Sequence, residues 1–563
     1  MEDQNEKSMT EYNESEEADV SRAGSGLLMK NRFTASLRSP AFCVFMFFAA
    51  FYYFTGGGEY LGGDQFHLRN VAANIAYNGQ LGFDIQGDLP DEMVGDFVKG
   101  KSSLYYAKWG LGQSLVEVPF YFFHGLVDGK RMSPGDFYPP GAGSSVSEMA
   151  VVYLAPALIS AAGCALIFGL GLLMGFSVRI SVLLSLLYGL ATIVWPYSKS
   201  LLSETTLNVA ILGGVYFSVR YVSKEERWAL VLSGACLGFA FLTKVTAGFV
   251  VPIVSLYILV ASGMRRGGRD LGLLFTPALL IFVLIQLWHN DIRYGNMFHF
   301  GYSLMWDRLG FSNPLLTGLW GLLLSPGKSF FLYSPVTVLG ILGLPSFFRR
   351  KKREIFLFLG TCAVIIVPHA CWWSWGGDWA WGPRFLLPIT PYLVVASGFF
   401  IASFSMNTRL IRAFIVSLIA LSFFIQVLGV VINPHIFLEM RSIVVVHSAN
   451  PTSGPDAPLF FDVNFSNFIP MFSHLAGHWW LFKHMLFPYD LSSDAPWKAM
   501  RDFHMPAPIG IEGERVYPFW WVYAFPRLLS SSAVWVYPLA CLNFLIMVWW
   551  GLRLSRFFRG QGS

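Results

Sequence analysis

The stretch Met149–Phe176, with the sequence MAVVYLAPALISAAGCALIFGLGLLMGF, contains no Asp, Glu, Lys or Arg. A helix of about 20 apolar residues spans the hydrocarbon core of a bilayer, so this stretch is long enough to cross a membrane. Similar apolar stretches recur along the chain. The sequence therefore predicts an all-α polytopic membrane protein.

The composition supports this class. Hydrophobic residues make up 54% of the chain and charged residues 13%, and the mean hydropathy is +0.50. A soluble chain carries roughly 25% charged residues. The six cysteines lie in or beside apolar stretches and form no CxxC pair, so we expect them to pack as small apolar helix residues.

The basic residues form seven clusters, with room for two spans between neighbouring clusters. The positive-inside rule places all seven clusters on the cytoplasmic face, which predicts about twelve transmembrane helices with both termini inside. The charges form no single basic surface, which argues against a nucleic-acid partner. The clusters are Lys30/Arg32/Arg38, Arg179, Lys224/Arg227, Arg265/Arg266/Arg269, Arg349–Arg353, Arg409/Arg412 and Arg553/Arg556/Arg559.

The predicted spans leave most of the remaining chain on the outer face. Residues 1–38 are expected to be a disordered cytoplasmic tail, 39–432 the main transmembrane module with an outer loop at about 57–147, 433–530 an outer-face region, and 531–563 the last helix with a basic tail. Within the outer loop, Gln65–Asn78 and Gly110–Phe123 have the spacing of amphipathic helices. The expected spans are Ala41–Thr55, Met149–Phe176, Ile180–Trp195, Thr205–Val222, Trp228–Leu242, Ala247–Ala261, Leu271–Trp288, Ser334–Phe348, Ile355–Ala370, Phe385–Phe404, Ala413–Ile432 and Ser532–Trp550.

A carboxylate follows the first span, in the segment Tyr60-Leu-Gly-Gly-Asp-Gln-Phe-His67. Asp64 has two interpretations that do not exclude each other. It caps a helix, because Gly-Gly-Asp before an apolar run is an N-cap signature, or it is a reactive acid at the outer face. Gln65 and His67 lie beside it and are candidates for contact with a substrate.

Further polar residues lie at the expected outer ends of the spans. Lys108 lies in Tyr105-Tyr-Ala-Lys-Trp-Gly-Leu-Gly-Gln113, where it would hold a phosphate or snorkel inside an aromatic belt. Glu204 either starts a helix, where the dipole favours an acid, or faces the same cavity as Asp64. Lys244 closes an outer helix end against the positive-inside trend, which a bound anion or outer headgroups would explain.

The segment Ser325-Pro-Gly-Lys-Ser329 resembles part of a nucleotide phosphate loop, but Leu322 stands where that motif requires its first glycine. A nucleotide site is therefore not expected. The segment is either a plain turn at the membrane entry or a turn whose Lys328 pairs with a lipid phosphate.

The loop Trp372-Trp-Ser-Trp-Gly-Gly-Asp-Trp-Ala-Trp-Gly-Pro-Arg384 carries five Trp residues around one acid and one arginine. It is either an interfacial aromatic belt or a binding surface. In a binding surface, indole faces such as those of Trp379 and Trp381 stack on sugar rings, and Arg384 holds a phosphate at two points.

Two histidines, His474 and His478, would share one face of a helix, and His484 follows closely. No HExxH pattern and no nearby acid complete a familiar zinc signature. Interfacial packing is the favoured interpretation, with a metal site as the alternative.

Taken in order, these segments resemble the GT-C superfamily, which includes bacterial glycosyltransferases akin to protein O-mannosyltransferases and to the aminoarabinose transferase of lipid A. The similarity extends from Gly62 to Arg384, and nothing beyond Ile432 contributes to it. The matching segments are Gly62-Gly-Asp-Gln65, Tyr106-Ala-Lys-Trp-Gly-Leu-Gly112, Trp195-Pro-Tyr-Ser198 with Glu204, Leu242-Thr-Lys244, Tyr294-Gly-Asn296, Ser325-Pro-Gly-Lys328 and Gly382-Pro-Arg384.

The resemblance implies a polyprenyl-phosphate sugar donor, transfer at the outer face and inversion at the anomeric carbon. It implies that Asp64 is the base that takes the proton of the acceptor hydroxyl. Cations would hold the leaving lipid phosphate, and Glu204 would orient the acceptor or bind a divalent metal. The superfamily often has a second acid after the first; Gln65 stands there, which argues against a metal-bridged acidic pair. The expected phosphate ligands are Lys108, Lys244, Lys328 and Arg384, and the expected sugar or acceptor contacts are Gln65, His67, Tyr106, Trp379 and Trp381.

The expected location is the bacterial inner membrane, with the active site facing the periplasm. The acceptor is a protein, a lipid or a polysaccharide, and the chain does not distinguish among them. One alternative is a membrane polysaccharide polymerase or ligase, which would depend on arginines more than on a carboxylate base. Another is a lipid or solute transporter, which would need polar residues near the bilayer midplane, whereas the polar residues here gather at helix ends.

Overall fold

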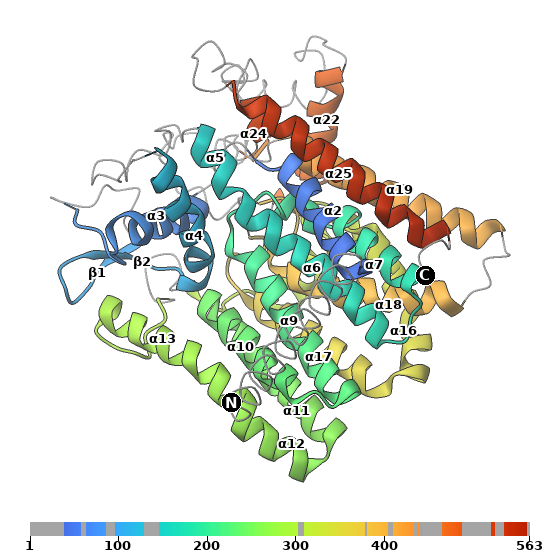
Figure 1. Cartoon of the computed structure of the whole chain (residues 1–563), viewed down its shortest axis with the longest axis horizontal. Helices are drawn as coiled ribbons and strands as arrows, with labels where there is room; N and C mark the ends of the chain where they lie inside the picture. The colour runs from blue at the N-terminus through green and yellow to red at the C-terminus, as the bar shows by residue number, and fades with distance from the viewer. Residues whose placement is uncertain are drawn as a thin grey trace, which may run out of the picture.

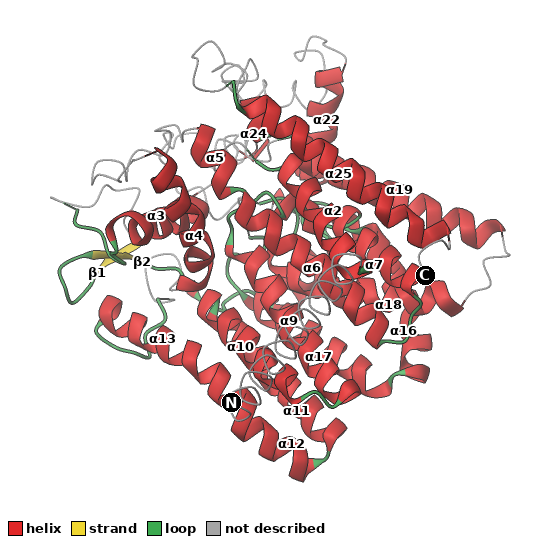
Figure 2. Ribbon diagram, viewed as in Figure 1, coloured by secondary structure: helices red, strands yellow, loops and turns green. Residues whose placement is uncertain are grey.

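A computed structural model of the chain describes residues 39–57, 63–85, 96–128, 146–301, 309–377, 380–403, 409–432, 437–438, 441, 464, 466–486, 519–523 and 534–559. The predicted cytoplasmic tail and most of 433–530 lie outside these residues. Figures 1 and 2 show a bundle of helices, with one small sheet at its edge.

The first half of the described chain forms a helical core and a smaller unit that carries the sheet. The N-terminus of helix α2 is capped, because the side chain of Ser39 accepts a hydrogen bond from the Phe42 N–H. Pro40 occupies the first turn. The elements are α2 (Pro40–Phe54), α3 (Gly63–Asn78), β1 (Phe97–Lys99), β2 (Tyr105–Ala107), α4 (Leu111–Asp128), α5 (Val146–Val152), α6 (Leu154–Leu173), α7 (Val178–Leu190), α8 (Val194–Tyr197), α9 (Ser203–Lys224), α10 (Arg227–Thr243), the 3₁₀ helix η3 (Val245–Phe249), α11 (Val250–Ser262), α12 (Met264–Asp270), the π-helical turn η4 (Leu271–Phe275) and α13 (Thr276–Tyr294).

The second half adds further helices to the same bundle, and in Figure 1 α19 and α25 cross its upper right side. Its core is closely packed: the rings of Phe347 and Phe399 stack with centroids 4.2 Å apart. The elements are α14 (Leu315–Leu324), α15 (Phe330–Tyr333), the 3₁₀ helix η6 (Pro335–Thr337), α16 (Val338–Arg350), α17 (Lys352–Cys371), the 3₁₀ helix η7 (Arg384–Ile389), α18 (Thr390–Ser403), α19 (Arg409–Val431), η8 (Pro470–Phe472), α22 (His474–Leu486), α24 (Trp520–Tyr523) and α25 (Val536–Arg559).

Seven helical segments within the described residues are long and apolar enough to cross a membrane. This confirms the polytopic helical class, while the count of twelve spans stays a prediction. Four shorter apolar helices are Pro40–Phe54, Val178–Leu190, Arg227–Thr243 and Leu315–Leu324. The seven candidate spans are Val146–Leu173, Val245–Ser262, Met264–Tyr294, Lys352–Cys371, Arg384–Ser403, Arg409–Val431 and Val536–Arg559.

Two features of the structure were not predicted. The outer loop contains an antiparallel pair of strands, β1 and β2, in which Val98 faces Tyr106. Helix α14 lies between two of the expected spans, where no helix was predicted, and it packs against α17. Helices do form in the predicted segments Gln65–Asn78 and Gly110–Phe123, as α3 and α4, while their position along the membrane surface stays a prediction.

The helices α9 and α10 show that the bundle has two chemically different ends. Helix α9 runs from Ser203 to Lys224, with Glu204 in its first turn, and α10 returns from Arg227 to Thr243, the residue before Lys244. At 1.5 Å per residue the 22 residues of α9 cover about 33 Å, close to the thickness of a bilayer core. Glu204 and Lys244 therefore lie at one end, and Lys224 and Arg227 at the other.

Several of the predicted cytoplasmic basic clusters meet at the second end, which we call the basic end. Arg227 binds Asp270 at 3.0 Å, Arg266 binds Glu225 at 2.8 Å, and the Nη1 of Arg353 donates to the carbonyl of Ala261 at 3.3 Å. This grouping is what the positive-inside rule requires of loops on one face.

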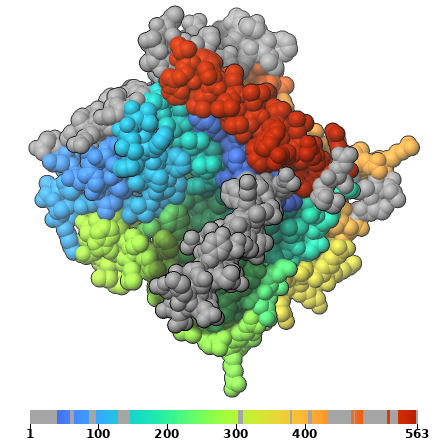
Figure 3. Space-filling view, viewed as in Figure 1, coloured from blue at the N-terminus to red at the C-terminus, as the bar shows by residue number. Residues whose placement is uncertain are grey.

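Helices α3 and α4, which belong to the predicted outer loop, form a unit beside the bundle. Figure 3 shows the surface of α3 and α4 bordering that of α13, and Lys101 of the outer loop binds Asp291 of α13 at 2.7 Å. Helix α24 joins the region after 433 to the bundle, because the ring of Trp520 stacks on that of Tyr53 with centroids 5.0 Å apart.

The predicted orientation is tested by cysteine labelling in sealed cells. Ser102 lies exposed in the outer loop and Arg265 exposed at the basic end. We expect Ser102→Cys to react with a membrane-impermeant maleimide in intact cells, and Arg265→Cys to react only after permeabilisation. The parent chain, with its six native cysteines, gives the background. The reverse pattern would contradict the predicted topology.

Candidate active site

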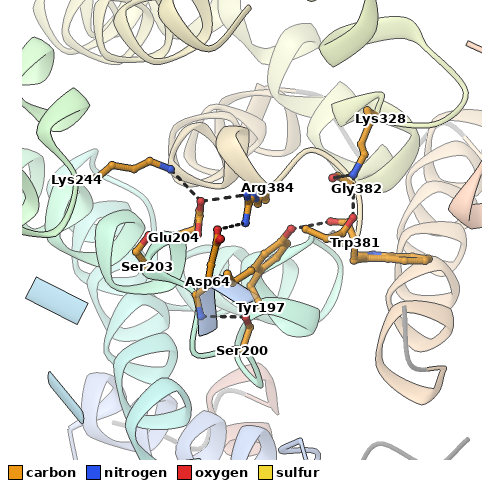
Figure 4. Close-up of polar contacts among 12 residues, drawn as sticks. Asp64, Tyr197, Ser200, Ser203, Glu204, Lys244, Lys328, Trp381, Gly382 and Arg384 are labelled. Atoms are coloured by element: carbon orange, nitrogen blue, oxygen red, sulfur yellow. Dashed lines mark hydrogen bonds and ion pairs between the residues drawn. The ribbon is translucent and has the colours of Figure 1, made fainter. Parts of the chain in front are cut away.

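Asp64 stands in the first turn of α3 and points at Arg384 (Figure 4). The Nη1 of Arg384 donates to the Oδ2 of Asp64 at 3.0 Å. The Asp64 side chain is 39% exposed and that of Arg384 is 15% exposed. A carboxylate in a salt bridge that still reaches solvent is available to a substrate.

Arg384 lies between two carboxylates. Its Nε is 3.9 Å from the Oε1 of Glu204, and the Nζ of Lys244 donates to the same Glu204 oxygen at 3.0 Å. Positive and negative side chains therefore alternate over four residues, as Figure 4 shows. We call Asp64, Arg384, Glu204 and Lys244 the charge chain.

Each member of the charge chain comes from the beginning or the end of a different element. Asp64 and Glu204 stand in the first turns of α3 and α9, where the helix dipole favours a negative charge. Lys244 follows the last residue of α10 with an extended backbone. Arg384 begins η7. Residues separated by more than 300 positions thus meet at one end of the bundle.

Phe385 supports both cations of the charge chain. The Lys244 ammonium lies 4.5 Å from the centroid of its ring and the Arg384 guanidinium 5.1 Å from it. The His369 ring stacks on Phe385 as well, with centroids 4.9 Å apart. The negative face of an aromatic ring attracts cations, so Phe385 helps to hold the two groups close together. Neither Phe385 nor His369 was predicted from the sequence as a site residue.

The burial of Glu204 explains why it needs two cations. Its side chain is 2% exposed, and a buried carboxylate is stable as an anion only when it is paired. Lys244 supplies a hydrogen bond and a charge, and Arg384 supplies a second charge. The charge chain contains two acids and two cations, so its formal charge is zero.

A second polar group lies on the outer loop. The Nζ of Lys108 is 2.9 Å from the Oδ1 of Asp96, and the Nε2 of His67 is 3.3 Å from the Oδ2 of the same residue. The His67 ring stacks on Trp109 with centroids 4.8 Å apart and planes 18° apart. We call Asp96, His67 and Lys108 the outer triad. Asp96 was not predicted, since a single loop acid outside any motif gives no signal.

The pKa of Asp96 reflects this environment. Burial raises the pKa of its carboxyl, but the hydrogen bond from His67 and the charge of Lys108 outweigh burial and lower the pKa below its usual value. Asp96 is therefore an anion at neutral pH.

Close packing places the outer triad next to the charge chain. A Cβ atom on Gly110 would lie 2.6 Å from the carbonyl oxygen of Leu242, and one on Gly112 would lie 2.8 Å from the Cα of Thr243. Only glycine allows this approach. The segment after Lys108 therefore lies directly against the residues before Lys244, while His67 follows Asp64 by about one turn of α3.

Arg293 fixes the backbone that carries Lys108. Its Nη1 donates to the carbonyls of Ala107, Lys108 and Trp109, each at 2.9 Å. Arg293 is 1% exposed. The Arg293-Tyr-Gly-Asn296 segment thus contributes to the site by holding the β2 end against α13.

Other predicted site residues have structural partners. The Oε1 of Gln65 accepts from the Leu201 N–H at 2.9 Å, and the hydroxyl of Tyr106 bonds to that of Ser102 at 2.8 Å. Neither contact reaches the charge chain, so the predicted substrate contacts of Gln65 and Tyr106 stay predictions.

Lys328 and Trp381 hold the loop that precedes Arg384. Lys328 is fully buried, and its Nζ donates to the carbonyls of Ala380 and Gly382 at 2.9 and 3.2 Å. The hydroxyl of Tyr197 donates to the Trp381 carbonyl at 2.9 Å (Figure 4). A phosphate role for Lys328 and a sugar role for Trp381 stay predictions, and Trp379 lies outside the described residues.

The predicted histidine pair lies behind the same loop. His474 and His478 are both buried, and the His478 ring packs on Trp381 with centroids 4.4 Å apart. The side chain of His484 lies outside the described residues. Within the part of the chain that the structure describes, no three His, Cys, Asp or Glu side chains form a metal-binding group.

The helices and the grouped charges at one end define a polytopic membrane protein with a candidate polar active site. Residues 144–289 match the family model described as dolichyl-phosphate-mannose-protein mannosyltransferase. This match supports the predicted resemblance to GT-C membrane glycosyltransferases. It covers about a quarter of the chain and includes Glu204 and Lys244, but not Asp64 or Arg384.

Two crystal structures of ArnT from Cupriavidus metallidurans are loosely similar in fold. The structure in the apo state shares 14% identity over 90% of this chain and 91% of that chain, with a TM-score of 0.45. The structure bound to undecaprenyl phosphate shares 13% identity over 88% of each chain, with a TM-score of 0.45. No curated protein matches this chain by sequence.

The contribution of the charge chain to the stability of the fold is tested by Glu204→Gln. The change removes the buried partner of Lys244 and Arg384, and breaking a buried ion pair costs about 3–5 kcal/mol. We therefore expect a clear drop in thermal unfolding temperature in detergent. The matched control is Glu226→Gln, which removes the partner of Arg220 at the basic end and should change little. Equal effects of the two substitutions would contradict the assignment.

Proposed function

We propose that the chain is a membrane glycosyltransferase. It moves a sugar from a polyprenyl-phosphate donor to an acceptor hydroxyl on the outer face of the membrane in which it lies. The observation that carries this proposal is the charge chain, because it combines an accessible carboxylate with cations suited to a phosphate. The family match supports the class of reaction, since the matched family is described by a lipid-phosphate sugar donor.

In the proposed reaction the acceptor oxygen forms a bond to the anomeric carbon while the bond from that carbon to the phosphate oxygen breaks. Asp64 takes the proton of the acceptor hydroxyl. The bonding electrons leave with the polyprenyl phosphate, whose charge Arg384 and Lys244 stabilise, together with Lys108. Attack opposite the leaving group inverts the anomeric carbon.

The salt bridge between Asp64 and Arg384 sets an order of events in this proposal. The Arg384 guanidinium occupies one oxygen of the Asp64 carboxylate, at 3.0 Å. A donor phosphate competes for the same guanidinium. When the phosphate binds Arg384, that oxygen of Asp64 is released to accept the proton of the acceptor hydroxyl, so the donor binds before the acceptor.

A divalent metal at Glu204 does not fit this donor set. The Oε1 of Glu204 is already held by the Lys244 ammonium at 3.0 Å and lies 3.9 Å from Arg384. Two cations beside a carboxylate repel a third. Glu204 instead positions the two phosphate-binding cations, and no step of the proposed reaction passes through a metal.

The base assignment is tested by Asp64→Asn in membranes supplied with a polyprenyl-phosphate sugar. We expect the transfer rate to fall by about 10²- to 10⁴-fold, since this is what a general base contributes. Asp291→Asn serves as control, because it removes a paired carboxylate of α13 from outside the charge chain. Full activity of the Asp64 variant would show that another group is the base.

The phosphate role of Arg384 is tested by binding of a sugar-free polyprenyl monophosphate. Arg384→Ala should weaken binding roughly tenfold or more, because a charge-assisted hydrogen bond contributes about 1.5–3 kcal/mol. Arg353→Ala, an exposed arginine at the basic end, should bind as the parent chain does. Unchanged affinity in the Arg384 variant would refute the role.

A further inference from the structure

The candidate site is electrically balanced before any donor binds. Each of its three principal cations has a carboxylate within ion-pair distance: Arg384 has Asp64, Lys244 has Glu204, and Lys108 has Asp96. A lipid phosphate would add negative charge to this balanced group. Tight binding therefore requires one of the three carboxylates to give up its partner.

The three carboxylates differ in how easily they could do so. Glu204 is buried inside the first turn of α9, and its removal from two cations would leave an unpaired buried charge. Asp64 gives up Arg384 to the donor phosphate in the proposed reaction, but it stays in the site as the base, so its negative charge remains close to the phosphate. Asp96 precedes β1, outside any helix, and its side chain is 29% exposed, so water can solvate it when it moves away.

The contacts of Asp96 match those that a phosphate would make. Its two oxygens are shared between two donors, Lys108 at 2.9 Å and His67 at 3.3 Å. A phosphate offers two such oxygens in the same way. The donors are held from behind, because Trp109 stacks on His67 and Arg293 fixes the carbonyl of Lys108. Such a fixed pair of donors keeps its geometry when the anion is exchanged.

We propose that Lys108 and His67 form one anion cradle and that Asp96 occupies it as an internal substitute for the donor phosphate. This rests on the proposed function, and it adds His67 to the phosphate ligands and gives Asp96 a role. The lipid phosphate displaces Asp96 from the cradle when it binds. Asp96 keeps the cradle assembled and neutral between turnovers, and it weakens donor affinity by competing for the same donors.

If Asp96 has this role, removing its charge should increase the affinity of the protein for a lipid phosphate. With full-length protein in detergent and sugar-free polyprenyl monophosphate as the probe, Asp96→Asn should bind roughly three- to tenfold more tightly at low ionic strength. The gain should shrink as salt is added, because screening weakens the repulsion that the substitution removes. Asp96→Ser with the same readout serves if the Asn variant does not fold.

The matched control is Asp291→Asn. Asp291 is also a carboxylate paired with an outer-loop lysine, Lys101, at 2.7 Å, but it is not part of the outer triad. Its loss should leave affinity unchanged. If Asp96→Asn folds and binds the lipid phosphate no better than the parent chain, while Lys108→Gln binds more weakly, Asp96 is a structural partner only and the inference is overturned.

Failure of the proposed function has a different signature. If neither the parent chain nor the Asp96→Asn variant binds polyprenyl monophosphate, the lipid-phosphate donor is wrong. The inference about Asp96 then falls with it.

Discussion

The Arg384 guanidinium between the carboxylates of Asp64 and Glu204 is the interaction on which the candidate site depends. It joins the outer loop to the helical bundle, because Asp64 belongs to α3 and Glu204 to α9. Burial makes the interaction strong: Glu204 is shielded from water, so its charge must be met by nearby cations. The same guanidinium is the group best suited to a phosphate. One residue thus holds the site together and, in the proposed function, also binds the donor phosphate.

The surrounding fold supports this residue from several directions. Lys328 and Tyr197 hold the carbonyls of the loop just before Arg384. The region after 433 reaches the same loop, since Asn464 donates to the carbonyl of Trp373 at 3.0 Å. The Trp-rich loop 372–384 therefore has a structural role in addition to any contact with sugars. The region after 433 contributes to the position of Arg384 through this loop.

Much of the fold could be predicted from the sequence, because apolar stretches and basic clusters report directly on membrane spans. The four members of the charge chain were each predicted, although their ion pairs were not, since residues 64, 204, 244 and 384 meet only through tertiary packing. Asp96 was missed because it lies in no motif. The hydrogen bonds of the Gln65 and Lys328 side chains to backbone groups inside the fold could not be predicted. A motif gives the type of a residue and not the partner that its side chain contacts. The exact number of spans could not be established from the sequence alone, because helices such as α10 and α16 are shorter than a full span and continue into turns or 3₁₀ segments.

The most direct test of this account is an experimental structure of the full chain with a bound polyprenyl phosphate. We expect phosphate density within hydrogen-bond distance of Arg384 and Lys108, with the salt bridge from Arg384 to Asp64 lengthened or broken. Phosphate density at the basic end would contradict it. So would a phosphate at the candidate site that leaves all three ion pairs as they are.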